Sequence, residues 1–284
     1  LQTLIQAELP WVTVTLCQMH QGNLYCGDIF KIPEYAGALK KGHAARLWIK
    51  VHHWSYRFYM RMRSGCSAIQ SVSETRAVGA ALECEAILKN KDSMVTTLHS
   101  DVFNVWVSKQ QRNGEKGRAS IAVAEAHRTS LTDPEVWKMI EEAWLVSEPA
   151  IKLARVGDSA KPTMGMVLDA WNQAGDRINE LPMATTAPNS RIRQIQALYA
   201  DRRKAALNAL HYAAYALEPS FLSKDIFSDE SVMEGLNSII FTMSSAHPLK
   251  DEAATRAIRE FHIYRAKQGL FARDTVNSMI DQMP

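Results

Sequence analysis

The sequence has few cysteines, only four in 284 residues: Cys17, Cys26, Cys66 and Cys84. So few thiols, all in the first third of the chain, indicate a reduced, intracellular protein rather than a disulfide scaffold. No apolar run reaches the roughly eighteen residues of a membrane span, so no membrane association is expected. Nucleophile elbows, glycine-rich phosphate loops and paired histidines on one helix are also absent from the sequence. It therefore offers no motif for catalysis.

Carboxylates are missing from one long stretch, between Glu34 and Glu74. The composition as a whole is that of a globular protein, with 46% hydrophobic and 22% charged residues and a net charge of +3. The stretch without carboxylates carries only basic charges: Lys40, Lys41, Arg46, Lys50, Arg57, Arg61 and Arg63. It is the most favourable place in the sequence for a polyanion to bind.

Secondary-structure signals predict an all-α, multi-helix protein with one short strand near its N-terminus. Residues 9–16 are β-branched and alternate in polarity, which is typical of a strand. Asp133 before Pro134 starts one helix, and Glu218 before Pro219 ends another. Residues 182–189 form the clearest linker. The helices are expected at 36–63, 77–90, 94–108, 118–129, 134–155, 162–181, 190–217, 229–244, 250–267 and 270–282.

The first of these helices, 36–63, carries a stripe of cations at spacings of three and four residues: Arg46, Lys50, His53, Arg57 and Arg61. An apolar face follows one residue later: Leu47, Val51, Trp54, Phe58 and Met62. One face can then be buried while its neighbour presents cations that follow the phosphates of a nucleic acid, with Trp48 and Tyr59 able to stack on an unpaired base. The alternative is that these are ordinary solvated charges beside a core face.

Cys17 and His20 have the spacing of half a zinc site. A second pair with convincing spacing is missing, although several nearby or distant side chains could complete the site through folding: Cys26, His43, His52, His53, His211, His247 and His262. The alternative is a buried cysteine followed by a histidine at a helix start. Zinc at Cys17 and His20 is thus one of two interpretations.

Several landmarks, in order, resemble those of the hAT superfamily of transposases. The N-terminal ones are Cys17, His20, Leu24, Asp28, Ile29, Ala45, Arg46, Ile49, His52 or His53, Met60, Arg61, Thr75 and Arg76. The later ones are Glu148, Pro149, the segments 155–158 and 161–165, and the sharpest match, the Leu-His-x-Ala-Ala-Tyr-x-Leu-x-Pro pattern at 210–219. One departure is that Ala77 stands where the family has an aromatic residue.

The resemblance implies a division of the chain. Residues 1–35 would be a remnant of the family's ribonuclease H-like core, and residues 36–284 an all-helical insertion domain with a sub-boundary near 182–189. The family's chemistry uses three metal-binding carboxylates. Two lie upstream of the Cys-x-x-His and one lies downstream of the helical domain, so this chain is expected to be a piece of a longer protein and not an enzyme by itself.

For function, the resemblance implies a nuclear protein that associates with DNA, with a homodimer formed through regions outside this chain. Arg46, Lys50, Arg57, Arg61 and Arg76 are the expected DNA contacts, and Cys17 and His20 are expected to lie near DNA. The alternative is a domesticated scaffold that has lost DNA affinity and binds a protein partner. A surface patch with Trp106, Trp137 or Trp144 would favour that alternative.

Overall fold

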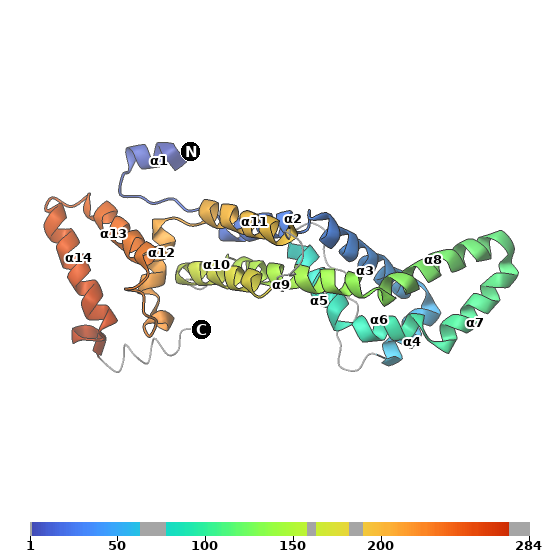
Figure 1. Cartoon of the computed structure of the whole chain (residues 1–284). Coiled ribbons are helices and arrows are strands. Elements are labelled where there is room, and N and C mark those ends of the chain that lie inside the picture. Colours follow the sequence, from blue (N-terminus) through green and yellow to red (C-terminus); the bar gives the residue numbers. More distant parts are fainter. Residues whose placement is uncertain (1, 63–77, 158–162, 182–189, 273–284) are drawn as a thin grey trace. The chain divides into compact units, whose positions relative to one another are not determined.

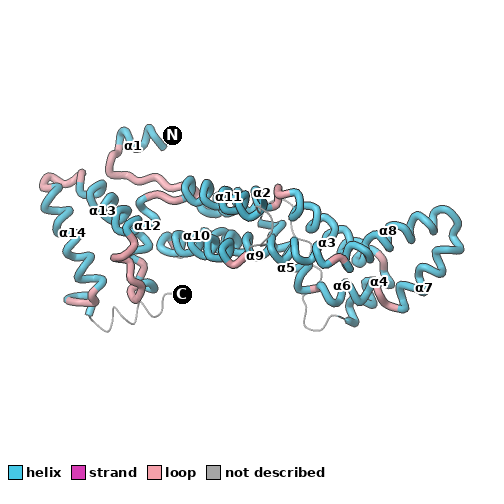
Figure 2. Tube along the Cα trace, viewed as in Figure 1, coloured by secondary structure: helices cyan, strands magenta, loops and turns pink. Residues whose placement is uncertain are grey.

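The computed structural model describes residues 2–62, 78–157, 163–181 and 190–272. Throughout these ranges the chain forms helices joined by short loops and contains no strand (Figures 1 and 2). The prediction of an all-α protein is therefore confirmed. In the same ranges, every helix is too short or too polar to cross a bilayer.

Some helix bounds follow the sequence signals, but the segment 94–108, expected as one helix, is divided at residues 99–100. The α-helices are α1 (Gln2–Glu8), α2 (Gln18–Ile29), α3 (Pro33–Val51), α4 (His53–Met62), α5 (Val78–Lys89), α6 (Lys91–Leu98), α7 (Asp101–Gln110), α8 (Gly114–Thr132), α9 (Pro134–Gly157), α10 (Met164–Asn179), α11 (Ser190–Ala206), α12 (Ala209–Leu217), α13 (Glu230–Ser244) and α14 (Lys250–Arg265). Short 3-10 helices lie at η1 (Gln111–Asn113), η2 (Pro219–Phe221) and η3 (Gly269–Ala272). The linker expected at 182–189 lies outside the described residues.

The strand expected at 9–16 is wrong. Residues 12–16 form a loop between α1 and α2 (Figure 2). Among the residues that the structure describes, no strand lies beside this loop to complete a ladder. The Val14 carbonyl instead accepts a hydrogen bond from the Asn208 side-chain amide at 3.0 Å. β-branched alternation makes a strand only where a partner supplies the backbone hydrogen bonds.

The chain divides into two compact units. The central unit comprises Gly22–Ile151 and Asp176–Leu198, and the terminal unit comprises Leu1–Gln21, Lys152–Gly175 and Tyr199–Pro284. Neither has a boundary near residue 36, where the resemblance divides the chain. The units reflect packing, whereas the expected division concerned ancestry, so that division stays a prediction.

In the central unit, the long helix expected at 36–63 is broken at His52. The backbone of His52 is extended, with ψ of 109°. The Ser55 hydroxyl donates to the carbonyl oxygens of Ile49 at 2.9 Å and His52 at 2.8 Å, and so satisfies acceptors left at the end of α3. Helices α3 and α4 are thus two shorter elements with separate buried faces.

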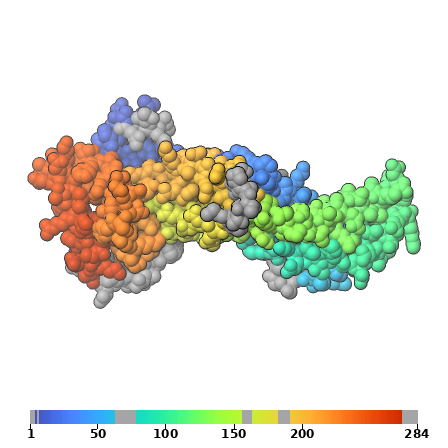
Figure 3. Space-filling view, in the orientation of Figure 1, coloured from blue at the N-terminus to red at the C-terminus, as the bar shows by residue number. Residues whose placement is uncertain are grey.

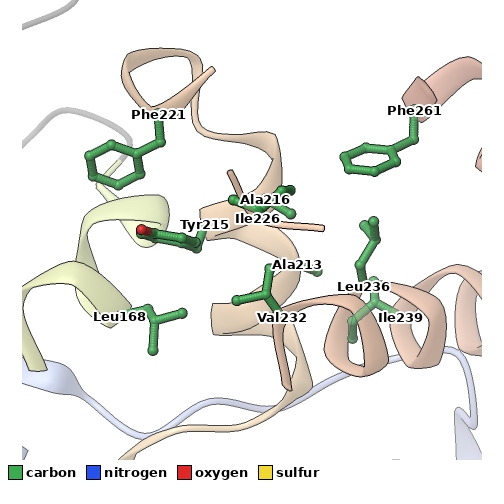
Figure 4. Close-up of a cluster of buried hydrophobic side chains, with 10 residues drawn as sticks. All are labelled: Leu168, Ala213, Tyr215, Ala216, Phe221, Ile226, Val232, Leu236, Ile239 and Phe261. Atoms are coloured by element: carbon green, nitrogen blue, oxygen red, sulfur yellow. The ribbon is translucent and has the colours of Figure 1, made fainter. Parts of the chain in front are cut away.

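The terminal unit is organised around α12, α13 and α14 (Figure 4). Its core brings together Leu168, Ala213, Tyr215, Ala216, Phe221, Ile226, Val232, Leu236, Ile239 and Phe261. The stop predicted at Glu218 and Pro219 is confirmed, because α12 ends at Leu217 and Pro219 begins η2. The helix expected at 190–217 is interrupted at Leu207 and Asn208, which separates α11 from α12.

Candidate nucleic-acid interface

The best candidate for a DNA-binding surface is the outer face of α4 with the end of α3. His53, Arg57 and Arg61 are exposed at four-residue spacing on α4, while Ser55 and Tyr59 are buried on its opposite side. Lys50, in the last turn of α3, is also exposed. Among the ion pairs of the described residues, none involves Lys50, Arg57 or Arg61. These three cations are available to a phosphate backbone.

Arg46 does not belong to this surface, which corrects the expected stripe. Its side chain is only 2% exposed, and its Nη2 atom lies 2.9 Å from Glu83 Oε1 and 3.0 Å from Glu83 Oε2. His43 Nδ1 lies 3.0 Å from the same carboxylate. A guanidinium that is buried between helices and paired with α5 cannot reach DNA. Its role is structural.

Arg76 lies outside the described residues, so its place in the interface stays a prediction. The two aromatic residues expected to stack on a base are not at the surface. Trp48 is buried, and Tyr59 is fully buried, with its hydroxyl donating to Asn90 Oδ1. Neither can receive a base without opening the core of the central unit.

The apolar face expected on this segment is also largely wrong. Leu47, Val51 and Met62 are exposed, Val51 to 77%. Trp54 and Phe58 are only partly buried. Helical periodicity places these residues on one side of an unbroken helix, but the break at His52 and the burial of Arg46 change which side faces the core.

Three tryptophans come together where α3, α4 and α7 meet. The ring centroids of Trp48 and Trp106 are 5.5 Å apart, those of Trp54 and Trp106 are 5.8 Å apart, and those of Trp48 and Trp54 are 5.9 Å apart. Edge-to-face and stacked arrangements at these distances add to the stabilisation from burial. This tryptophan cluster anchors α4, and with it Arg57 and Arg61, on the central unit.

Cys17 and His20 are both exposed, at the start of α2. Within the described parts of the chain, no three His, Cys, Asp or Glu side chains gather in a way that could hold a metal ion. Cys26, one of the residues considered as a further ligand, is buried, and burial raises the pKa of its thiol to about 12. The thiolate that zinc requires is therefore disfavoured at Cys26. Zinc at Cys17 and His20 stays a prediction.

His211, the histidine of the best-matching sequence pattern, is fully buried. Its Nδ1 atom accepts a hydrogen bond from the Asn208 backbone N–H at 3.1 Å, at the first turn of α12. Its Nε2 atom lies 3.1 Å from the Gln18 side-chain amide. Burial lowers the pKa of this imidazole, which favours the neutral ring. His211 therefore caps α12 and fills the core of the terminal unit.

Sequence reasoning missed a second group of cations, at the connection between α7 and α8. The expected helices 94–108 and 118–129 left residues 109–117 as an unassigned connection, but Lys109, Arg112, Lys116 and Arg118 all lie exposed there. The signal was present in the sequence, since Glu115 is the only carboxylate in 109–118.

Comparison of the chain with protein-family models, curated proteins and solved structures found no match.

Proposed function

We propose that this chain is a transposase-derived, DNA-associated helical module that is not catalytic by itself. The observation that carries the proposal is the group of three exposed cations that form no ion pair with any residue in the described parts of the chain: Lys50, Arg57 and Arg61. They lie in the stretch of sequence that contains no carboxylate. Cations in such a setting attract DNA by releasing the counterions condensed on its phosphates.

The ordered landmarks shared with hAT transposases support the same proposal, because DNA is what proteins of that family act on. The strongest landmark, at 210–219, has a second explanation in this chain, since His211 and Tyr215 are buried in the core. The cations of α4 are the more direct support. A nuclear location and a homodimer formed through other regions belong to the same proposal.

The proposal is tested by fluorescence anisotropy of labelled duplex, hairpin and single-stranded DNA across a salt series. We expect binding at low salt that weakens steeply as salt increases. The double variant Arg57→Ala/Arg61→Ala should lower the magnitude of the salt slope by about two, since each lost phosphate contact removes about 0.9 from the slope.

A matched control removes two exposed lysines that are already paired on the central unit. Lys89 lies 2.6 Å from Glu85, and Lys138 lies 3.7 Å from Glu135. The variant Lys89→Ala/Lys138→Ala changes the net charge by the same amount, so it separates local contacts from overall charge. Equal slopes for the two double variants would remove Arg57 and Arg61 from the interface, and no binding at low salt would refute a DNA-associated function.

A protein-binding scaffold is the second candidate, and one observation favours it. Exposed aliphatic side chains lie on the helices that build the tryptophan cluster and on α8: Leu47, Val51, Val102, Val105 and Val123. Trp106 is partly buried beside them, whereas Trp137 is buried and donates to the Leu131 carbonyl oxygen at 2.7 Å. Trp144 is also partly buried. Apolar residues of this kind at a surface often mark partner contacts.

The partner that fits this surface is an amphipathic helix with acidic margins, because Lys50 lies between Leu47 and Val51 in sequence. The probe is a designed peptide helix with leucines on one face and glutamates beside them. If the scaffold hypothesis holds, the peptide binds and Val51→Asp abolishes binding, while DNA binding is absent. If the peptide does not bind, the scaffold hypothesis loses its support.

A further inference from the structure

The hairpin of α7 and α8 ends in a cluster of exposed cations. This hairpin tip comprises residues 109–118 and carries Lys109, Arg112, Lys116 and Arg118 with a single carboxylate, Glu115. Among the ion pairs of the described residues, none involves these four cations. In Figure 3 the end of the hairpin, in green, stands clear of the rest of its unit.

The hairpin tip is held by a close approach between its two helices. Gly114 has a φ of +61°, a conformation that other residues rarely adopt, and it allows the chain to turn from η1 into α8. Gly117 packs against the end of α7 so closely that an added Cβ would lie 1.9 Å from the Gln110 carbonyl oxygen. The Asn113 side-chain amide also donates to Gln110 Oε1 at 2.9 Å. The positions of the cations are therefore fixed by the backbone that carries them.

We propose that the hairpin tip is a second phosphate-contacting surface for duplex DNA. This inference rests on the proposed function and deepens it, since it names the form of DNA and the kind of contact. Arg112 and Lys116 are its central residues, one on each side of the turn. Each donates to phosphate oxygens when DNA is bound.

The width of the hairpin determines which part of DNA it can contact. Two packed helices lie 8–10 Å apart, and each is about 10–12 Å across with its side chains, so the hairpin is roughly 20 Å wide. The major groove of B-DNA is only about 12 Å wide. With its two helices lying side by side across the groove, the hairpin tip is too wide to enter it, so we place its contacts on the sugar–phosphate backbone, without regard to sequence.

The side chains at the tip favour duplex DNA over a single strand. No aromatic residue occurs in 109–118, so unpaired bases have nothing there on which to stack. Aromatic platforms supply much of the affinity of single-strand binding proteins. What remains at the tip is charge alone, which suits the regular phosphates of a duplex.

The α4 face and the hairpin tip belong to the same compact unit, and α4 packs against α7 (Figure 1). Helix α7 has ten residues and is about 15 Å long, less than the roughly 34 Å of one helical turn of DNA. Distance therefore does not prevent one duplex from contacting both surfaces. Because one duplex can contact both the α4 face and the hairpin tip, we favour DNA over an acidic protein surface as the ligand of the tip.

The test compares Arg112→Ala/Lys116→Ala with the parent chain in anisotropy titrations of two duplexes of unrelated sequence across a salt series. We expect the magnitude of the salt slope to fall by about two on both duplexes. The charge-retaining variant Arg112→Lys/Lys116→Arg should keep the parental slope. The paired-lysine variant Lys89→Ala/Lys138→Ala serves as the control for net charge.

Each other outcome identifies which idea fails. If the parent binds duplex DNA and the Arg112→Ala/Lys116→Ala variant keeps its salt slope, the hairpin tip is not part of the interface, while the proposed function survives. A loss confined to one of the two duplexes would mean base readout and would overturn phosphate contact. If the parent does not bind duplex DNA at low salt, both the proposed function and this inference are refuted.

Discussion

Replacing Arg46 with methionine separates a structural cation from the cations that we propose to contact DNA. The Arg46 side chain is 2% exposed and that of Glu83 is 9% exposed, so both charges of the pair are shielded from water. Methionine keeps much of the volume of the side chain but leaves the Glu83 carboxylate without its guanidinium partner. Breaking a buried ion pair in this way costs about 3 to 5 kcal/mol, because the remaining charge stays desolvated. His43 Nδ1 still lies 3.0 Å from the Glu83 carboxylate in this variant, so about 5 kcal/mol is an upper bound.

The assay is native-state hydrogen exchange read at the amides of α3 and α5, which reports the free energy of opening where the substitution acts. We expect Arg46→Met to lower that free energy by about 3 to 5 kcal/mol. Replacing both partners, as Arg46→Met/Glu83→Leu, should recover a large part of the loss because no charge is then left buried.

For DNA binding, in contrast to stability, we expect the single variant Arg46→Met to have no effect. Under conditions where it remains folded, Arg46→Met should keep the parental salt slope, whereas Arg57→Ala should lower it by about one. If the variant lost less than about 1 kcal/mol of stability and also had a lower salt slope, Arg46 would be a surface cation, because exposed ion pairs contribute only about 0 to 1 kcal/mol. That result would refute the reasoning from burial.

Two further predictions concern the hairpin and the core of the terminal unit. Gly117→Ala should destabilise the α7–α8 hairpin by about 1 to 3 kcal/mol, because its Cβ would overlap the Gln110 carbonyl oxygen. Gly37→Ala is the control, since a Cβ there meets nothing within 4 Å, and it should stabilise α3 by about 0.5 to 1 kcal/mol; hydrogen exchange of each helix measures both, and equal effects would contradict the close approach. For His211, burial lowers the folded-state pKa below the unfolded value of about 6.5. Stability is therefore expected to fall as the pH drops from about 6.5 towards the folded pKa, by at most about 1.4 kcal/mol per pH unit. Urea titrations of the parent and His211→Gln between about pH 5 and 7.5 test this difference, and parallel curves would show that the ring does not titrate as a buried group.

Local signals in the sequence were sufficient to predict the helical class and several helix ends. Pro134 starts α9, because proline fits the first turn of a helix, and α12 ends before Pro219, because proline disfavours helical geometry in the residue that precedes it. The strand at 9–16 could not be judged in the same way. A strand depends on a partner elsewhere in the chain, and the sequence of 9–16 alone does not say whether one exists.

The candidate site was predicted in part. Periodicity grouped Lys50, Arg57 and Arg61 correctly as exposed cations, but it also included Arg46. Whether a charged residue lies inside depends on a counter-charge brought by folding, and Glu83 comes from a different helix. The hairpin tip was missed for a different reason, because its cations lie on both sides of a turn and share no helical period.

The tryptophan cluster of the central unit also has an optical consequence. Indole rings 5.5 to 5.9 Å apart couple their electronic transitions, and the coupling gives a paired band in far-ultraviolet circular dichroism that overlaps the helical signal. Helix content derived from such a spectrum would be misjudged. The paired band would disappear when α3, α4 and α7 separate. Trp11 and Trp171 belong to the terminal unit and are not part of the tryptophan cluster that gives this band. Circular dichroism can therefore follow the opening of the central unit without any added label.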